Sequence, residues 1–170
     1  MPMWHIYCPV DAYTALDKQV LATAVTDLYA AEPSPRLPRF YVSVVFQELP
    51  ADCFFIGGEP RNNFVRIWID HIAVHMQTDT ARHDRWMRKI HETIGPWVRD
   101  RGFDYEVHVD ETPRGLWSIQ GLKPPEWGSD EEKRWSQENS ASPSPDGATT
   151  FGSLPQGLHS QDPVVNRNRS

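Results

Sequence analysis

Proline at position 2 is the residue whose type and place suggest the most direct chemistry. If Met1 is removed, the chain begins with a secondary amine, which can act as a base or as a nucleophile. An unperturbed α-amine has a pKa of about 7.7–8.0 and burial lowers it, so a partly buried amine is largely neutral near pH 7 and suits general-base catalysis. Proline after an initiator methionine is also common, and proline is tolerated at the start of a strand. The dipeptide alone therefore leaves both interpretations open.

Two side chains could help such an amine to move protons. Tyr29 or His108 could hold a developing enolate oxygen or return a proton at another atom. The reaction would be keto–enol tautomerisation or a 1,3 shift of a double bond, and it needs no metal or organic cofactor. Tyr29 could equally be a packing residue whose hydroxyl meets the backbone, and His108 could face solvent or an interface.

An anionic substrate would need a cation to bind it. The candidate cations are Arg39, Arg66 and Arg114. Arg66 could instead pair with Asp70 or Glu59, and Arg114 could cap the structure of a neighbouring subunit. Trp117 is the aromatic candidate for substrate binding.

The two histidines at positions 71 and 75 have the spacing of a metal-binding pair on a helix. His71 and His75 lie at a predicted strand end, however, and no third ligand is near them in the sequence. We therefore predict no metal site.

The composition indicates a single globular domain with a real core. The chain has 170 residues, of which 39% are hydrophobic and 24% are charged. The formal net charge of −6 argues against a nucleic-acid partner. No apolar run approaches the ~18 residues of a membrane span and the first ten residues do not read as a signal peptide, so we expect a cytosolic protein. Cys8 and Cys53 are too few for a disulfide framework or a metal-ligand set.

Two segments of the same plan, strand, helix and strand, follow one another along the chain. In the first, residues 3–8 read as a strand, and Thr14 is a plausible N-cap with Asp17 three residues on. The predicted apolar helix face consists of Leu16, Val20, Leu21, Ala24, Val25 and Leu28. A β-branched and aromatic strand over residues 40–47 closes this unit.

The second segment begins with a strand over residues 64–72. A helix is predicted from about residue 80 to residue 101, with Gly95-Pro96 expected to bend or break it and Gly102 expected to end it. Residues 103–109 form the last predicted strand. Each unit is long enough for a parallel β-α-β crossover.

The predicted fold class is α/β, with one four-stranded mixed sheet made of two parallel pairs and both helices on one face. We expect the other face to be a large apolar surface that oligomerisation covers. Between the two units, residues 54–58 read as a short extended piece ending in a turn. The turns and aromatic residues after Asp110 are expected to clasp a neighbour or cap the sheet. The domain is expected to cover residues 1–139, followed by a disordered tail over residues 140–170.

Several short motifs carry a resemblance to a known family. These motifs are Thr26–Tyr29, Phe46–Glu48, Phe55–Gly58, Asn63–Arg66, Asp70–Ala73 and His108–Arg114, with Leu116, Trp117 and Gly121. Through them the chain resembles the tautomerase superfamily, and within it cis-3-chloroacrylic acid dehalogenase and its fungal relatives, which are labelled oxalocrotonate tautomerases. The similarity covers about residues 2–139.

The resemblance implies a homotrimer of two-β-α-β subunits whose three sheets pack into a barrel-like core. It also implies that Pro2 is the catalytic residue at the base of each active site. The rest of the dehalogenase machinery is not matched. This chain has Tyr29 in place of a histidine, and Val74 and about Met76 in place of two arginines. His108 stands in place of a tyrosine.

The glutamate that activates water in the dehalogenase falls near Ile119 or Gln120 of this chain. Hydration of an acrylate needs a base for water and cations for the carboxylate, so hydrolytic dehalogenation is not predicted. We expect instead a cofactor-independent isomerase or tautomerase that uses Pro2 on an enolisable or unsaturated carbonyl compound. Val74 and Met76 favour an apolar substrate, such as a secondary metabolite.

Two alternatives to proton transfer stay open. The chain could be a non-catalytic binding or assembly subunit of the same fold. Pro2 could also form an iminium with an aldehyde, as in a lyase or cyclase.

Overall fold

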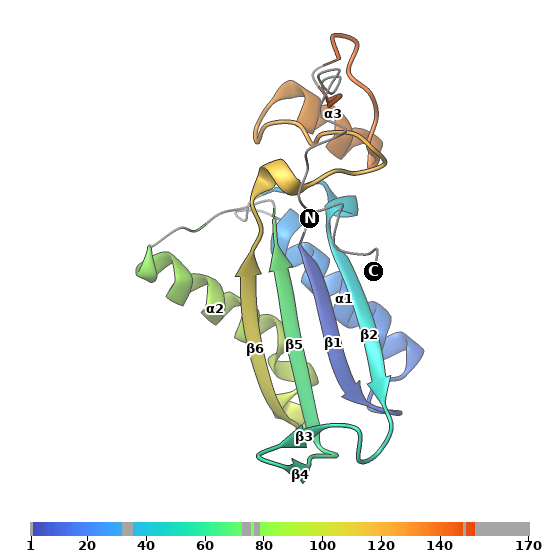
Figure 1. Cartoon of the computed structure of the whole chain (residues 1–170), viewed down its shortest axis with the longest axis vertical. Coiled ribbons are helices and arrows are strands. Elements are labelled where there is room, and N and C mark those ends of the chain that lie inside the picture. The colour runs from blue at the N-terminus through green and yellow to red at the C-terminus, as the bar shows by residue number, and fades with distance from the viewer. Residues whose placement is uncertain (1, 32–35, 73–75, 77–78, 148, 152–170) are drawn as a thin grey trace, which may run out of the picture.

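A four-stranded mixed sheet with strand order β2-β1-β5-β6 forms the centre of the computed structural model (Figure 1). The structure describes residues 2–31, 36–72, 76, 79–147 and 149–151. The strands of the sheet are β1 (Met3–Pro9), β2 (Ser43–Leu49), β5 (Phe64–His71) and β6 (Asp104–Glu111). β1 runs parallel to β2 and β5 runs parallel to β6, whereas β1 and β5 are antiparallel. This arrangement confirms the two consecutive β-α-β units.

Helix α1 (Ala15–Ala30) begins at the predicted cap. The Thr14 hydroxyl accepts a hydrogen bond from the Asp17 amide at 3.1 Å, and the Asp17 carboxylate accepts one from the Thr14 amide at 2.9 Å. The predicted buried face was partly wrong, because Leu16 and Val20 are 68% and 45% exposed. The buried stripe starts one turn later and has a spacing of four residues. It consists of Leu21, Val25 and Tyr29.

Helix α2 (Thr80–Ile94) ends where the Gly95-Pro96 pair was predicted to break it. Two short 3₁₀ helices, η2 (Gly95–Trp97) and η3 (Arg99–Arg101), continue the chain. Gly102 follows with φ of 76°, a left-handed conformation that favours glycine. The short piece between the two units is a hairpin of β3 (Phe55–Ile56) and β4 (Glu59–Pro60).

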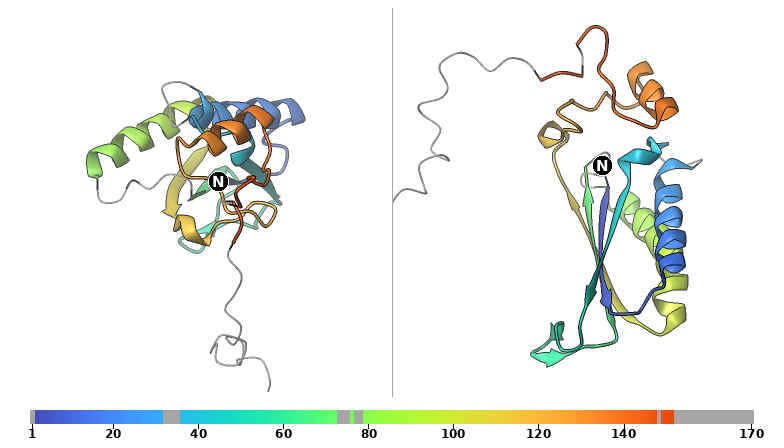
Figure 2. Two further views of the ribbon diagram at one scale, coloured as in Figure 1. Left: turned by 90° about the horizontal axis from the view of Figure 1, so that it is seen from above. Right: turned by 90° about the vertical axis from the view of Figure 1, so that its right-hand side faces the viewer.

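Both helices cover one face of the sheet and leave the other face open, as the edge-on view in Figure 2 shows. Inward residues of the central strands are fully buried, among them Trp4, Ile6, Ile67 and Ile69. The open face is less apolar than the large apolar surface that we expected. Its middle row, one residue from each strand, is Val45, His5, Trp68 and His108. Alternation sends most of the aliphatic residues inward and leaves mainly polar and aromatic residues outward.

The chain after β6 caps the end of the sheet where β1 begins (Figures 1 and 2). It forms η4 (Arg114–Leu116) and helix α3 (Asp130–Glu138), which was not predicted. Ser129 caps α3 by accepting from the Glu132 amide at 3.1 Å, a pattern that was readable in the sequence. An aromatic cluster joins this segment to the 3₁₀ helix η1 (Arg39–Tyr41) before β2. The cluster consists of Phe40, Tyr41, Trp117 and Trp135.

The folded chain continues past the expected boundary at residue 139. Trp135 Nε1 donates to the Ser142 carbonyl at 2.8 Å, and the Lys123 amide donates to the Thr149 carbonyl at 2.6 Å. Ser144 and Thr149 are buried. The expected tail is therefore bonded to α3 through Ser142 and to the segment before α3 through Thr149, whereas residues 152–170 lie outside the described part of the chain. Within that described part, no helix is long and apolar enough to cross a membrane.

Candidate active site at the start of β1

Pro2 lies at the end of the sheet that the C-terminal segment caps, directly before β1. The residue is buried, and its carbonyl accepts a hydrogen bond from the Ser43 amide at 3.0 Å. This bond continues the pairing between β1 and β2, so Pro2 is held in line with the sheet. The sheet therefore fixes the position of the nitrogen that Met1 removal would expose as an amine.

Two titratable side chains share a row of the sheet with Pro2. Met3 pairs with Asp70, so the same register places Pro2 beside His71, and His71 pairs with Glu111 on β6. The Thr112 amide donates to the His71 carbonyl at 2.9 Å, which keeps β5 and β6 together to this end. Alternation places all three side chains on the helix side of the sheet. We call Pro2, His71 and Glu111 the Pro2 row.

Aromatic rings cover the histidine of the Pro2 row. His71 is 1% exposed. The indole of Trp86 from α2 stacks on its imidazole with ring centroids 5.6 Å apart, and the Tyr29 ring lies 5.7 Å away. Sequence reasoning considered His71 only as a metal ligand. Its alternation with Ile67 and Ile69 was the signal that places it under the helices beside Pro2.

Tyr29, a candidate acid, lies on the same side of the sheet as Pro2. Its hydroxyl accepts a hydrogen bond from Trp4 Nε1 at 3.2 Å, and its ring packs against Trp86. Burial raises the pKa of Tyr29 far above its ordinary value, although the bond from Trp4 opposes this. A phenol held in this way stays protonated, so it can donate a hydrogen bond but cannot act as a base near neutral pH.

His108, the other candidate, lies on the opposite face of the sheet. Its Nδ1 accepts a hydrogen bond from Arg66 Nη2 at 2.9 Å, and its Nε2 lies 3.5 Å from an Asp110 carboxylate oxygen. Arg66 also forms an ion pair with Glu106. The structure therefore brings His108 and Arg66 together, but it places both on the open face, away from the side that Pro2 shares with Tyr29.

The two remaining arginines contact the protein itself. Arg39 forms an exposed ion pair with Asp27, with 2.6 Å between the nearest atoms. Arg114 donates to the carbonyls of Pro124 and Pro125, and its guanidinium lies 5.7 Å from the Trp117 ring centre. The contacts of Arg114 hold the C-terminal segment in place, whereas that of Arg39 joins η1 to α1.

Trp117 and Tyr41 meet in the aromatic cluster above the Pro2 end of the sheet. Their ring centroids lie 4.9 Å apart, and both side chains are buried. Burial raises the pKa of Tyr41 well above its ordinary value, and nearby Glu132 adds to this. Within the described part of the chain, the Tyr41 hydroxyl has no hydrogen-bond partner. Trp117 therefore serves as a packing residue in this subunit, and Tyr41 brings an unused donor to the same region.

A cavity of about 280 Å³ lies between α2 and the end of β6. Its lining is mainly apolar, with two titratable groups at Glu111 and His83. The lining residues are Met76, His83, Trp86, Met87, Val109 and Glu111. Glu111 accepts a hydrogen bond from the Met76 amide at 2.6 Å. Val74, the other position predicted to make the site apolar, lies outside the described residues.

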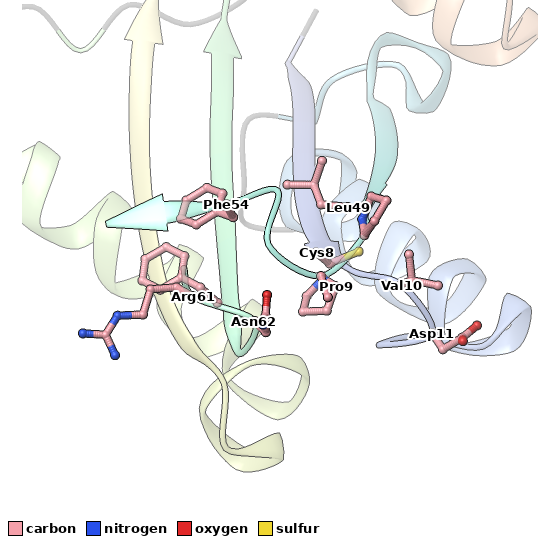
Figure 3. A pocket seen from close by; sticks show the side chains of 11 residues that line it. Cys8, Pro9, Val10, Asp11, Leu49, Phe54, Arg61 and Asn62 are labelled. Carbon is pink, nitrogen blue, oxygen red and sulfur yellow. The ribbon is translucent and has the colours of Figure 1, made fainter. Parts of the chain in front are cut away.

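A second cavity of about 270 Å³ lies at the opposite end of the sheet. Cys8 and Pro9 from β1 line it together with Leu49 and Phe54 (Figure 3). Arg61 belongs to its rim, but its guanidinium points away from Cys8 in this view. Burial raises the pKa of the Cys8 thiol to about 11, so this thiol is a poor nucleophile near neutral pH.

No group of three or more potential metal ligands occurs among the residues that the structure describes. His75 of the predicted histidine pair lies outside these residues. The ionisable groups described at this end of the sheet are the His71 imidazole, the Glu111 carboxylate and the phenols of Tyr29 and Tyr41.

Comparison with known proteins assigns the chain to a family. Residues 1–140 match the family described as "Putative oxalocrotonate tautomerase enzyme". None of the curated proteins compared with the chain matches it. Native RhCC from Rhodococcus jostii RHA1 is 44% identical, with 84% of this chain and 99% of that chain covered and a TM-score of 0.78.

Two further structures agree with this assignment. A probable enzyme from the thermophilic fungus Aspergillus fumigatus is 41% identical over 84% of this chain and 96% of that chain, with a TM-score of 0.75. N1, a member of the cis-3-chloroacrylic acid dehalogenase family, is 19% identical over 81% of this chain and 97% of that chain, and its TM-score of 0.61 shows a shared fold. The chain belongs to the oxalocrotonate tautomerase family of the tautomerase fold.

Proposed function

We propose that the protein is a cofactor-independent tautomerase or isomerase in which the Pro2 amine is the general base. The observation that carries this proposal is the place of Pro2, which is buried in line with β1 at the end of the sheet where His71 and Glu111 follow it. Membership of the oxalocrotonate tautomerase family supports an activity of this class. Removal of Met1 is part of the proposal, because a peptide nitrogen has no basic lone pair.

The proposed reaction moves one proton and needs no other reactant. The neutral Pro2 nitrogen takes a proton from the carbon next to a carbonyl group, and an enolate forms. The same proton, now on the Pro2 ammonium, returns to the other end of the conjugated system. A protonated phenol is the donor that would stabilise the enolate oxygen. Tyr29 and Tyr41 are the candidates on this side of the molecule, because His108 lies across the sheet.

The proposed substrate is an apolar carbonyl compound. The cavity beside the Pro2 row is lined mainly by methionine, tryptophan and valine. The three arginines considered for anion binding have partners within the chain. A small dicarboxylate would find little positive charge here. Faster turnover of small 2-oxo acids than of apolar enols would contradict this assignment.

We also propose that the protein assembles as a homotrimer through the open face of the sheet. This face is without a covering layer in the single chain (Figure 2). Fused 4-OT proteins of the same fold, 16–20% identical to this chain, form symmetric and asymmetric trimers. Sedimentation velocity of the full chain is expected to give three times the monomer mass.

The tautomerase proposal is tested by comparing the wild type with Pro2→Ala on a panel of enols and unsaturated acids. Mass spectrometry first establishes that Met1 is absent from the wild type. Turnover is expected to fall by about 10²–10⁴, the usual contribution of general-base catalysis, in a form that retains Met1 and so has only an amide nitrogen at position 2. Pro2→Ala keeps a primary amine there and is expected to lose less, with the oligomeric state unchanged. Equal turnover in the form that retains Met1 would remove Pro2 from the mechanism. Borohydride trapping with an aldehyde separates proton transfer from iminium formation, because only an iminium is reduced to a stable adduct.

One observation favours a second function, that of a non-catalytic binding or assembly subunit. The candidates His108, Arg66, Arg39 and Arg114 are all engaged in contacts within the chain. Retention of Met1 in the purified protein, together with no turnover across the panel, would support this second function.

A further inference from the structure

The register of β1 and β5 places His71 opposite Pro2, on the helix side of the sheet. The last paired residues of the two strands are Met3 and Asp70, and the Thr112 amide holds the end of β5 to β6 by donating to the His71 carbonyl. Directly opposed residues of antiparallel strands have Cα atoms about 4.5–5.5 Å apart, so adjacent side chains on one face are in contact. This register therefore places the His71 side chain between those of Pro2 on β1 and Glu111 on β6.

The rings around His71 restrict its orientation. Trp86 stacks on it with an interplanar angle of 26°, and Tyr29 packs at 52°. An imidazole forms hydrogen bonds only in its own plane, and the Trp86 ring covers one face of it. A neutral imidazole has one N–H donor and one bare nitrogen that accepts. His71 can therefore accept from one neighbour in the row while its other nitrogen donates elsewhere.

We propose that His71 is a positioning residue for Pro2, whose amine N–H it accepts, so that the nitrogen lone pair faces the substrate. This inference rests on the proposed role of Pro2 as the base. The neutral amine has one N–H bond and one lone pair. A hydrogen bond that sets the direction of the N–H bond therefore also sets the direction of the lone pair. After proton abstraction the ammonium has two N–H groups. One stays on His71 and the other proton returns to the substrate, so His71 stays neutral and gains no proton.

The position of Glu111 supports this role. It is the next residue in the row, and its carboxylate also accepts from the Met76 amide at 2.6 Å. Met76 and Glu111 both line the cavity between α2 and β6. The Pro2 row therefore connects the amine to the wall of this cavity, and a change in the histidine is expected to alter the base without removing the cavity.

The test is an NMR titration of the Pro2 amine in the full chain labelled with ¹³C and ¹⁵N at proline. His71→Phe keeps a flat ring between Trp86 and Tyr29 but removes both nitrogens. An acceptor beside an amine favours its charged form, so this variant is expected to lower the pKa of the Pro2 amine by about one unit. His71→Gln restores an acceptor and is expected to recover at least half of that shift. A matched control is His91→Phe. His91 lies on α2 and contacts Tyr105 on β6, away from Pro2.

The kinetic readout follows from the same change. In His71→Phe, kcat is expected to fall about tenfold with little change in KM, and the acid limb of kcat/KM moves to lower pH with the Pro2 pKa. A packing role alone would lower activity at every pH and leave the limb in place. A Pro2 titration that is the same in wild type and His71→Phe overturns the inference. If the form that retains Met1 keeps full turnover while the titration shifts in His71→Phe, the proposed function fails and the contact between His71 and Pro2 stands.

A second measurement needs no substitution at His71. A chain that retains Met1 has a tertiary amide at Pro2, which has no N–H to donate. The ¹⁵N signals of the His71 ring are expected to differ between this form and the mature chain, since an accepted hydrogen bond is lost. Identical signals in the two forms would contradict the contact even if His71→Phe fails to fold.

Discussion

The two faces of the sheet are built from the same strands but have opposite characters. On β5, Ile67 and Ile69 point under the helices and are buried, whereas Arg66 and Trp68 point to the open face. The helix side places Pro2 in a row with His71 beneath packed rings. The open side holds a row of stacked rings. The ring centroids of His5 and His108 lie 5.2 and 5.8 Å from that of Trp68.

The difference shows which polar residues can act together. Residue type alone suggested that Pro2, Arg66 and His108 could share one site. Within one subunit the sheet separates the last two from the first. The helix side therefore has the features of a reaction site, with buried and oriented groups, and the open side has those of a polar interface.

The largest expected difference between the faces is in stability. Trp4→Ala removes a fully buried ring and its hydrogen bond to Tyr29, so it is expected to lower the free energy of unfolding by about 3–5 kcal/mol. Trp68→Ala changes a ring that is 36% exposed and is expected to cost less than about 1 kcal/mol in the monomer. Urea unfolding at low protein concentration compares them. Equal losses would mean that the open face is packed like the core.

The two cysteines give a chemical test of the same division. Cys8 points under α1 and its pKa is raised to about 11, mainly by burial, whereas Cys53 is exposed. A rise of two units from 9.0 means about a hundredfold less thiolate, so iodoacetamide at pH 8 is expected to modify Cys53 at least about 100 times faster than Cys8. Peptide mass spectrometry over time measures both rates. Comparable labelling would show that the Cys8 side of the sheet opens readily.

Self-association is the next contrast. If copies of the chain meet through the open face, Trp68→Ala is expected to weaken the trimer by about tenfold or more, since buried tryptophans dominate interface energies. The matched change Leu16→Ala alters an exposed residue on the outer side of α1 and is expected to leave assembly intact. Sedimentation equilibrium separates the two variants. A trimer that is insensitive to Trp68 and sensitive to Leu16 would place the interface on the helices instead.

The smallest expected effect concerns an ion pair on the helix side. Bonds from Arg101 and, to a lesser extent, Thr14 hold the pKa of Asp17 well below its ordinary value. The folded chain thus binds this proton less readily than the unfolded chain. The resulting stabilisation is present above about pH 4 and is lost as the pH falls through the lower folded pKa.

Asp17→Asn is therefore expected to lose less stability than the wild type between pH 5 and about pH 2. Urea unfolding midpoints measured across this range give the slope of stability against pH for each protein. Asp84→Asn, a change on the exposed surface of α2, serves as the control and should follow the wild type. If the stability of Asp17→Asn falls with pH as steeply as that of the wild type, the contact with Arg101 does not contribute to stability in solution.

Much of the fold was predictable because local signals agreed. The Thr14 and Asp17 pair starts α1, and the Gly95-Pro96 pair ends α2. These features act over a few residues, so the sequence shows them directly. The cap at Ser129 and Glu132 before α3 was of the same kind and was overlooked, because the acidic residues around it have no apolar period.

The candidate site was harder to predict because it depends on register between distant strands. His71 lies beside Pro2 only because Met3 pairs with Asp70, a contact across 67 positions of the chain. The partners that occupy Arg66 and Arg114 depend likewise on tertiary packing. Strand alternation could have separated Arg66 from His71, but no local pattern could have placed Tyr41 above the Pro2 end of the sheet.

The most direct test of the account is hydrogen exchange at carbon, catalysed in D₂O and followed by NMR. The wild type, with Met1 shown to be absent, is expected to exchange the hydrogen next to the carbonyl group of an apolar ketone or enol. A form that retains Met1 is expected to be slower by about 10²–10⁴, because an amide nitrogen at position 2 cannot remove the proton. Exchange at the same rate in both proteins, with both correctly folded, would contradict the claim that the Pro2 amine is the base.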